Sequence, residues 1–386
     1  MKFVVNAEKF QSAVRRVMSG VSAKTLNAML NNILIEAEGD TVHLTTYDME
    51  IRIRTAVPAV VEETGRTAIP AKKFNEVVSV LPMGDLRFEI VTSGNEENAQ
   101  KARVQCQKSK YDLNVQNADG FPAAEPFVED WSFGVGGKDL VDCLCKTFYA
   151  RSNDESRAAL NGVLVSLQGG MRTIAASDGR RLALVQTNMA APAAAAGEGG
   201  DASPVAEATR EGSFILPSKV VGELIRSVDQ SKSVVVHLSQ NMALFELGDT
   251  IVTSKLVDKA YPNFRSVIPS EFRSVVNIPR ALFADVLNRI RKVVSENEDG
   301  SSIKLTIDKD VMKISASSQE YGAAEEFVDV QLEGDPMEID FNPQYLSDPL
   351  KSLYCDFFQM KFNDKTTPVE VTGDPGFIYI LMPMRS

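Results

Sequence analysis

The sequence predicts an α+β protein made of three repeats, each with two helices set among antiparallel strands. One helical pattern, an aromatic residue or leucine followed by apolar residues three and four positions later, occurs in segments that start at Val5, Val135 and Ile278. A second pattern occurs in the same order in segments that start at Ala68, Ile215 and Ile339. Regular recurrence along a chain indicates a repeat architecture, and here the first pattern recurs after 130 and then 143 residues.

The first repeat shows how the elements are expected to alternate. An apolar stripe at Phe10, Ala13, Val14 and Val17 has the spacing of an amphipathic helix. Residues 31–57 alternate between apolar and polar side chains, and the break at Gly39 predicts a hairpin. Further strands are expected over 2–6, 87–93 and 102–116, and six helices over 7–18, 71–81, 137–149, 218–228, 279–293 and 343–353.

Prolines and the repeat spacing divide the chain into three domains, over 1–125, 126–268 and 269–386. Residues 189–212 are rich in Ala, Gly and Pro and have almost nothing to bury. We expect them to form a disordered loop inserted between two strands of the middle domain. This insert lies inside the second, longer repeat spacing and accounts for its extra length.

Bulk composition is that of a soluble globular protein, with 44% hydrophobic and 24% charged residues. No apolar run approaches the roughly 20 residues of a membrane span, and the N-terminal apolar stretch is too short for a signal peptide. The four cysteines are expected to be reduced thiols. We therefore expect a cytoplasmic protein that does not enter a membrane.

Charge is distributed unevenly between the predicted helices and the rest of the chain. The helices carry fourteen basic and seven acidic residues, which is a net charge of +7. Because the whole chain has a net charge of −11, the residues outside the helices carry a net charge of −18. Lysine and arginine favour helices and cover their solvated faces, which is one explanation. Glutamate shares that preference, however, and contributes only Glu8, Glu76 and Glu223. The other explanation is a basic helical surface that meets a polyanion through its phosphates, without base recognition.

The residues that catalysis would require are not grouped in the sequence. His43 and His237 lie in alternating, strand-like segments, and Cys143 and Cys145 do not share a face of their helix. No Walker loop, dinucleotide fingerprint or nucleophile elbow is present. Asp48 and Asp178, at equivalent places in two repeats, are expected to form turns. We therefore expect no catalytic residue, no metal and no cofactor. An enzyme whose catalytic carboxylates lie far apart in the sequence stays open as an alternative.

Several motifs together resemble the bacterial DNA polymerase III β subunit, the sliding clamp. They are the opening MKF, LNGVL from Leu160, SDGRRLALV from Ser177, SKLVDKAYPNFRSVIP from Ser254 and the terminal YILMPMRS. The resemblance implies three similar clamp domains, each with two helices backed by antiparallel sheets. It also implies a head-to-tail homodimer that closes into a ring, with the helices lining a hole through which double-stranded DNA passes.

The resemblance further implies a groove between the second and third domains that binds short peptide motifs. Its partners would be the DNA polymerase III α subunit, the clamp loader and other replication and repair proteins. Matching positions are Leu160, Ser177, Gly179, Arg180, Arg181, Leu182, Pro262, Val267, Ile380, Leu381, Met382, Pro383, Met384 and Arg385. The apolar members would form an adaptable trough, with one or two arginines at its rim.

Two other sets of residues follow from the resemblance. DNA-facing positions would be Arg15, Lys24, Lys72, Lys73, Lys219, Arg280 and Arg289. The dimer interface would pair Lys108, Lys110, Tyr111 and Leu113 with Val293, Val294, Glu296 and Glu298. The sequence departs from the family at Arg180, where histidine is common, at Ser266, where arginine is common, and at Ala158 and Ala159, where aromatic residues are common. Pro349 is expected to interrupt the last helix.

The leading hypothesis is a processivity factor that encircles duplex DNA and tethers the replicative polymerase. The alternative is a peptide-binding scaffold that never encircles DNA and whose basic helices face an acidic protein. Charge reversal on the helices should harm DNA synthesis only under the leading hypothesis, whereas loss of the terminal motif should abolish partner binding under both.

Overall fold

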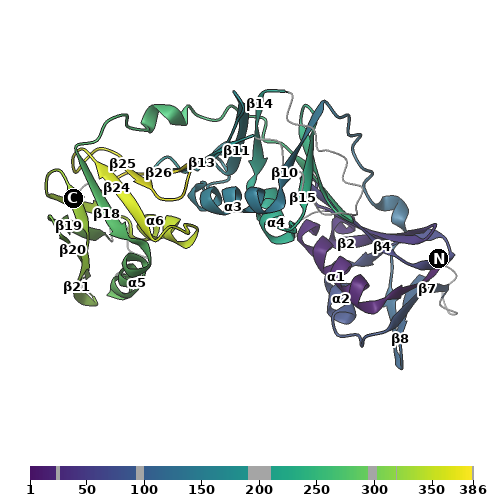
Figure 1. Cartoon of the computed structure of the whole chain (residues 1–386). Helices are drawn as coiled ribbons and strands as arrows, with labels where there is room; N and C mark the ends of the chain where they lie inside the picture. Colours follow the sequence, from purple (N-terminus) through teal and green to yellow (C-terminus); the bar gives the residue numbers. More distant parts are fainter. Residues whose placement is uncertain (23–26, 93–99, 190–209, 294–301, 319, 385–386) are drawn as a thin grey trace, which may run out of the picture. The chain divides into compact units, whose positions relative to one another are not determined.

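The computed structural model describes residues 1–22, 27–92, 100–189, 210–293, 302–318 and 320–384, which form two compact units (Figure 1). The first unit contains Met1–Gly137 and Gly222–Leu256. The second contains the described parts of Lys138–Ala193, Glu207–Val221 and Val257–Ser386. None of the helices among these residues is long and apolar enough to cross a membrane.

Two antiparallel sheets form the first unit. A five-stranded sheet has the order β5-β1-β7-β8-β9, and an eight-stranded sheet has the order β10-β15-β16-β17-β4-β3-β2-β6. The strands are β1 (Lys2–Asn6), β2 (Asn32–Glu38), β3 (Thr41–Tyr47), β4 (Ile51–Pro58), β5 (Val60–Glu63), β6 (Gly65–Pro70), β7 (Asp85–Thr92), β8 (Gln100–Cys106), β9 (Ser109–Asn114), β10 (Trp131–Gly136), β15 (Ser233–Leu238), β16 (Met242–Leu247) and β17 (Thr250–Lys255). The hairpin predicted at Gly39 is confirmed, because it joins β2 to β3.

Helices α1 (Ala7–Val17) and α2 (Ala71–Val78) pack against both of these sheets. Asn6 caps α1 by accepting a hydrogen bond from the backbone N–H of Lys9 over 3.1 Å. The predicted apolar stripe of α1 is buried. Four phenylalanines form the core between the helices and the five-stranded sheet: Phe3 of β1, Phe10 of α1, Phe74 of α2 and Phe88 of β7.

A nine-stranded and a four-stranded antiparallel sheet form the second unit. Their orders are β14-β11-β12-β13-β26-β25-β24-β18-β22 and β21-β20-β19-β23. The strands are β11 (Gly162–Gln168), β12 (Met171–Ser177), β13 (Arg181–Asn188), β14 (Gly212–Pro217), β18 (Ser274–Pro279), β19 (Ile303–Ile307), β20 (Val311–Ser318), β21 (Gly322–Asp329), β22 (Gln331–Glu333), β23 (Met337–Phe341), β24 (Phe357–Phe362), β25 (Val369–Thr372) and β26 (Phe377–Leu381). The remaining helices are α3 (Gly137–Thr147), α4 (Ser218–Ser227), α5 (Arg280–Ile290) and α6 (Pro343–Ser347).

All six predicted helices are present, and most are shorter than predicted. Helix α6 ends at Ser347, and Pro349 starts a 3₁₀ turn over Pro349–Lys351, because proline has no N–H to continue the helical hydrogen bonds. The interruption predicted at Pro349 is therefore confirmed. Helices α3 and α5 likewise end in 3₁₀ turns, over Phe148–Ala150 and Arg291–Val293.

The insert predicted between two strands of the middle domain does fall between β13 and β14. The predicted insert extends too far at its C-terminal end, because Gly212 already belongs to β14. Glu211 is also ordered, since its carboxylate accepts a hydrogen bond from the backbone N–H of Gly169 over 2.8 Å. The disorder predicted for the insert concerns residues 190–209, which lie outside the described residues.

Strand pairing joins successive repeats into continuous sheets. Strand β17 pairs with β4, placing Ser254 opposite Ile51, and β26 pairs with β13, placing Leu381 opposite Arg181. The predicted domain boundaries near residues 125 and 268 fall between strands, but each of the two large sheets contains strands from both sides of a boundary. The three domain limits therefore stay a prediction.

Replacing Phe88 by alanine should destabilise the first unit by about 3–5 kcal/mol, because the cavity left in the aromatic core cannot close completely. Phe88 is fully buried and its ring stacks on that of Phe3 with 4.8 Å between centroids. Urea unfolding followed by circular dichroism measures the change. Val80→Ala is the control, since Val80 is 72% exposed and its loss should change the free energy of unfolding by no more than ~0.5 kcal/mol. Equal losses of stability in the two variants would contradict this account of the core.

Candidate functional site

A tight turn connects β12 to β13 in the second unit. The Asp178 carboxylate accepts hydrogen bonds from the backbone N–H groups of Arg180 (2.8 Å) and Arg181 (3.0 Å). Gly179 adopts a φ of +91°, in the left-handed region that favours glycine. The turn predicted for Asp178 is therefore confirmed, and it holds a fixed shape because backbone and side chain are both hydrogen-bonded.

Strand β26 brings the C-terminal motif beside this turn. Leu182 of β13 lies opposite Ile380 of β26. Beyond the end of β26, the backbone N–H of Met382 donates a hydrogen bond to the carbonyl of Arg180 over 3.0 Å. Two motifs from distant parts of the sequence thus share one ladder of backbone hydrogen bonds.

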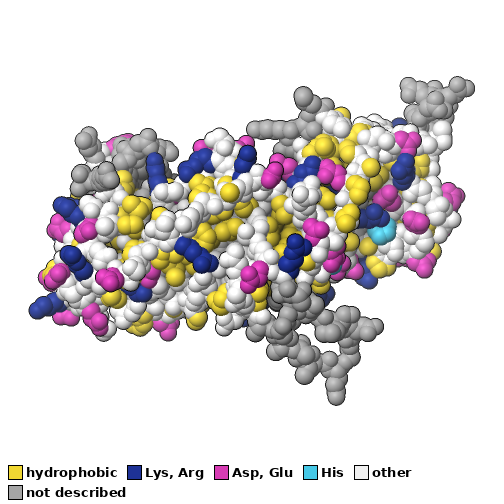
Figure 2. All heavy atoms as spheres, turned by 90° about the horizontal axis from the view of Figure 1, so that it is seen from above, with side chains coloured by type: hydrophobic (Ala, Val, Ile, Leu, Met, Phe, Trp, Pro, Cys, Tyr) yellow, Lys and Arg dark blue, Asp and Glu magenta, His cyan; other side chains and the backbone are white. Residues whose placement is uncertain are grey.

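An apolar cluster forms a floor on one face of the nine-stranded sheet, and Leu182 and Ile380 belong to it. Four side chains of the segment after β17 pack against the cluster: Val257, Tyr261, Phe264 and Ile268. At its border Val267 is 47% exposed and Met382 is 40% exposed. Exposed apolar side chains at the surface are the kind of feature that binds an apolar side chain of a partner, so these two residues are candidates for the predicted groove. On the face drawn in Figure 2, hydrophobic side chains reach the surface between charged ones.

The predicted groove residues divide by exposure. Gly179, Arg180, Pro262, Val267 and Met382 are exposed, Ser177, Pro383 and Met384 are half-buried, and the side chain of Arg181 is only 8% exposed. Leu160, Leu182, Ile380 and Leu381 are buried. Arg385 lies outside the described residues. The exposed set is what a peptide could touch, whereas the buried set gives the groove its shape.

Arg181, one of the arginines among the predicted groove residues, has its guanidinium group held by ion pairs beneath the turn. This group pairs with the carboxylates of Asp348 (2.7 Å) and Asp178 (3.0 Å) and donates to the carbonyl of Tyr149 over 2.6 Å. It also lies 4.1 Å from the ring centroid of Tyr345. Burial alone would lower the pKa of Arg181, but Tyr379 and Asp348 raise it above its usual range. Of the two described arginines expected at the rim, only Arg180 is exposed.

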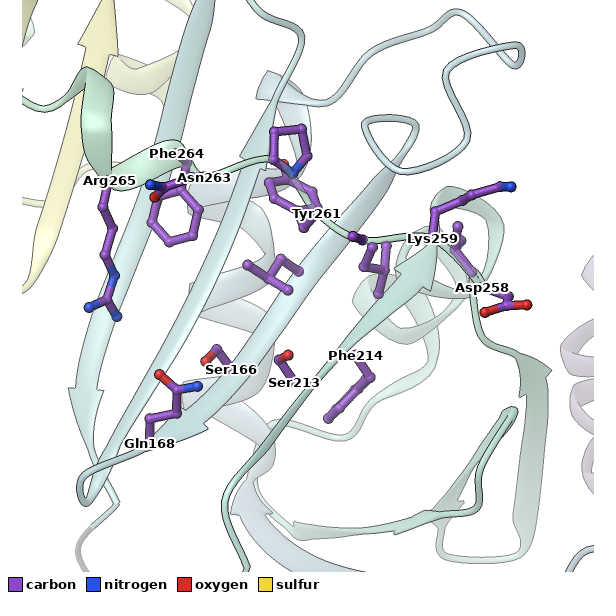
Figure 3. A pocket seen from close by; sticks show the side chains of 15 residues that line it. Ser166, Gln168, Ser213, Phe214, Asp258, Lys259, Tyr261, Asn263, Phe264 and Arg265 are labelled. Carbon is purple, nitrogen blue, oxygen red and sulfur yellow. The ribbon is translucent and has the colours of Figure 1, made fainter.

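A cavity of about 720 Å³ lies on the same sheet face, under the segment that follows β17 (Figure 3). Ser166 and Gln168 of β11 and Ser213 of β14 line it from the sheet, and Tyr261 and Arg265 line it from the segment. Burial raises the pKa of the Tyr261 hydroxyl well above its usual range. None of these residues was predicted as part of a site, although the alternation of β11 places its polar side chains Ser166 and Gln168 on one face.

The helical cations predicted to face DNA have different partners. Arg15 of α1 and Lys72 of α2 are exposed. Lys73 pairs with Glu76, and Arg289 pairs with Glu326 of β21. Three further positions complete the set: Arg280 is half-buried and donates to the carbonyl of Cys355 over 2.7 Å, Lys219 is half-buried, and Lys24 lies outside the described residues. Part of the predicted positive charge is therefore used inside the fold.

Each of the four sheets ends in strands that pair with no further strand among the described residues, and two of these edges lie near the predicted dimer interface. Strand β9 is one edge of the five-stranded sheet and carries Lys110, Tyr111 and Leu113, while Lys108 lies in the turn before it. Strand β21 is one edge of the four-stranded sheet and carries Phe327, which is 59% exposed. Val293 is half-buried at the end of the 3₁₀ turn after α5, and Val294, Glu296 and Glu298 lie outside the described residues. Strand β21 belongs to the group of strands predicted after the first helix of the third repeat, although no bounds were predicted for it.

The two histidines lie in strands, as predicted, with His43 in β3 and His237 in β15. His237 is bracketed by carboxylates, 2.7 Å from Glu129 and 3.3 Å from Glu246. Within the described ranges, no three His, Cys, Asp or Glu side chains come together in a way that could hold a metal ion.

Models of the DNA polymerase III β subunit match three parts of the chain: the N-terminal domain over residues 1–125, the central domain over 201–263 and the C-terminal domain over 265–385. The chain belongs to the DNA polymerase III β subunit family. The resemblance seen in the sequence is confirmed, and the chain is a DNA sliding clamp. The predicted α+β class and clamp-domain architecture are confirmed with it.

Relatives of this clamp match it over its whole length. The β sliding clamp of Caulobacter vibrioides is 30% identical over 393 residues, covering 100% of both chains. That of Synechocystis sp. is 29% identical over 399 residues, covering 100% of this chain and 99% of the relative. The structure of the Pseudomonas aeruginosa sliding clamp bound to griselimycin has a TM-score of 0.87 at 26% identity, with 100% of both chains covered. The Bacillus subtilis sliding clamp, at 24% identity, shares the fold with a TM-score of 0.89 over 100% of this chain and 99% of that one.

Replacing Arg181 by methionine should destabilise the clamp by about 3–5 kcal/mol, because Asp348 and Asp178 lose a buried cation. Thermal and urea unfolding measure the loss. Arg180→Met is the matched control on the adjacent, exposed position and should change stability by no more than ~0.5 kcal/mol. If the two variants unfolded alike, Arg181 would not hold the turn.

Proposed function

We propose that two copies of this clamp pair head to tail into a ring around duplex DNA and hold partner proteins through the groove beside Met382. The observation that carries the proposal is that two of the sheet edges in the described part of the chain, β9 and β21, carry exposed aromatic side chains beside charges of opposite sign. A contact between two different surfaces of identical copies closes into a ring when the rotation between the copies allows it. Pairing would also cover edges that otherwise favour aggregation.

The two edges are complementary in charge and both carry apolar side chains. The β9 side offers Lys108 and Lys110 together with Tyr111, which is 37% exposed. The β21 side offers Glu325 together with Phe327. Opposite charges steer such an encounter, and the aromatic side chains would supply apolar burial. We therefore add β21 to the interface expected from the sequence.

DNA would pass along the paired helices of each repeat and would be contacted through its phosphates. Arg15 and Lys72 are exposed on α1 and α2, which lie side by side and are linked by the contact of Phe10 with Phe74. Few and weak phosphate contacts suit sliding, because retention comes from enclosure. In this proposal the clamp catalyses no reaction and works in the cytoplasm.

The groove would bind short peptide segments of the DNA polymerase III α subunit, the clamp loader and other replication and repair proteins. Met382 and Val267 present adaptable apolar surface over the buried floor. Arg180 is exposed on the turn and can hold a polar group of the peptide. Met382 is thus the residue whose removal should weaken every partner that uses the groove.

Reversing the charge of both Arg15 and Lys72 to glutamate should weaken DNA binding and reduce polymerase processivity. The slope of log K against log salt should fall by about 0.9 for each phosphate that the variant no longer neutralises. The measurement is retention of the loaded clamp on nicked circular DNA and its release when the circle is cut. Lys309→Glu with Lys365→Glu is the matched control, since both residues are exposed in loops away from the helices. Equal retention on linear and circular DNA would instead favour a scaffold that never encircles DNA.

Phe327→Asp should convert the dimer into monomers, because it places a second negative charge beside Glu325 and removes apolar surface from the interface. Sedimentation velocity or light scattering then gives about half the wild-type mass. Val60→Asp is the control, because Val60 is 68% exposed on β5, the other edge of the five-stranded sheet. A dimer that survived Phe327→Asp would remove β21 from the interface.

A further inference from the structure

The turn between β3 and β4 repeats the backbone of the groove turn in the first unit. The Asp48 carboxylate accepts hydrogen bonds from the backbone N–H groups of Glu50 (3.0 Å) and Ile51 (2.8 Å). Met49 adopts a φ of +80°, the left-handed conformation that glycine has in the groove turn. A methionine is strained there. The first repeat therefore has the same turn even though its backbone is strained at Met49.

The neighbouring strand also repeats the groove. Strand β17 lies beside β4 as β26 lies beside β13. The backbone N–H of Lys255 donates to the carbonyl of Glu50 over 3.0 Å, as that of Met382 does to Arg180. Lys255 thus stands at the position of Met382. By the same register, Arg52 stands at the position of Leu182.

A cavity of about 210 Å³ lies at this place, wholly within the first unit. Its apolar wall includes Phe127, Leu244 and Ile251, and Ile251 is 39% exposed. Arg52 and Lys255 line it as well. The repeat of the partner groove therefore has two cations where the partner groove has a leucine and a methionine.

Arg52 is short of partners for its charge. Its side chain is half-buried, donates to the carbonyl of Pro122 over 3.4 Å and lies 5.8 Å from the ring centroid of Tyr47. No carboxylate of the described residues forms an ion pair with it. Burial, followed by the neighbouring Arg54, lowers its pKa. A half-buried guanidinium group beside a cavity is stabilised by an anion that enters the cavity.

We propose that this cavity is a second peptide site, which binds a short partner segment carrying a carboxylate next to an apolar side chain. The carboxylate would pair with Arg52, and the apolar side chain would lie against Leu244 and Ile251. Lys255 forms an ion pair with Glu125 over 2.8 Å. When the peptide binds, Lys255 could leave Glu125 and pair with the peptide carboxylate instead. Glu50 and Glu125 also line the cavity, and they would repel a nucleic-acid chain, which carries a charge on every phosphate, more than one peptide carboxylate beside an apolar group.

The inference rests in part on the proposed function, because the turn and strand it repeats are those of the partner groove. The test therefore separates the two sites. Its probe is the fluorescein-labelled peptide Gly-Glu-Glu-Leu-Phe-Gly, and fluorescence anisotropy measures binding to the full chain carrying Met382→Glu, which blocks the partner groove. The matched probe Gly-Gln-Gln-Leu-Phe-Gly lacks the carboxylates.

We expect the acidic peptide to bind the Met382→Glu chain and the neutral peptide to bind it at least about tenfold more weakly. Adding Arg52→Gln should weaken the acidic peptide by a similar factor, whereas Arg66→Gln, at an exposed arginine elsewhere, should leave it unchanged. Ile251→Ser, on the apolar wall, should also weaken binding and provides a second test if Arg52→Gln unfolds.

Three outcomes would overturn the second site. Binding that is abolished by Met382→Glu and unaffected by Arg52→Gln would place the peptide in the partner groove alone, which supports the proposed function. Equal binding of the acidic and neutral peptides would remove Arg52 from recognition. Stronger Arg52-dependent binding of a short single-stranded oligonucleotide would make the cavity a nucleic-acid contact. Conversely, a polymerase-derived peptide that bound wild type and Met382→Glu alike would contradict the partner groove and leave the second site standing.

Discussion

Backbone pairing between repeats is the constraint on which the rest of this clamp depends. Strand β17 completes the sheet of the first repeat through β4, and β26 completes the sheet of the second repeat through β13. Each pairing satisfies a row of buried backbone N–H and carbonyl groups that would otherwise be costly to leave without partners. Because the pairing fixes the register, it also fixes which side chains meet at each seam, and both candidate peptide sites lie at these seams.

The two seams show how one backbone supports different surfaces. At the seam of the second unit, Leu182 is part of a buried apolar cluster, Met382 is 40% exposed, and the side chain of Arg181 is buried in an ion pair with Asp348. At the seam of the first unit, the equivalent positions are Arg52 and Lys255. The turn geometry is kept even where it strains Met49. Side-chain chemistry at a few positions, rather than a change of fold, therefore separates one seam from the other.

Charge is likewise divided between holding the fold and meeting a partner. Buried Lys146 pairs with Asp142 and Asp374, and Arg289 is paired on the surface with Glu326. The helical excess of +7 read from the sequence therefore overstates what DNA could meet. Exposed cations such as Arg15 and Lys72 remain available, and a modest field suits a protein that must move along its ligand.

The sequence by itself determined the repeats, the six helices, several strands of the first repeat and the Asp178 turn, because each depends on local spacing of apolar residues and on turn chemistry. Only the tertiary structure decided that Arg181 is buried and that, within the described residues, β21 is an unpaired edge and Arg52 has no carboxylate partner. Each of these depends on segments far apart in the chain meeting in a particular register. A local pattern shows which face of an element is apolar, but it does not show which other element will cover that face.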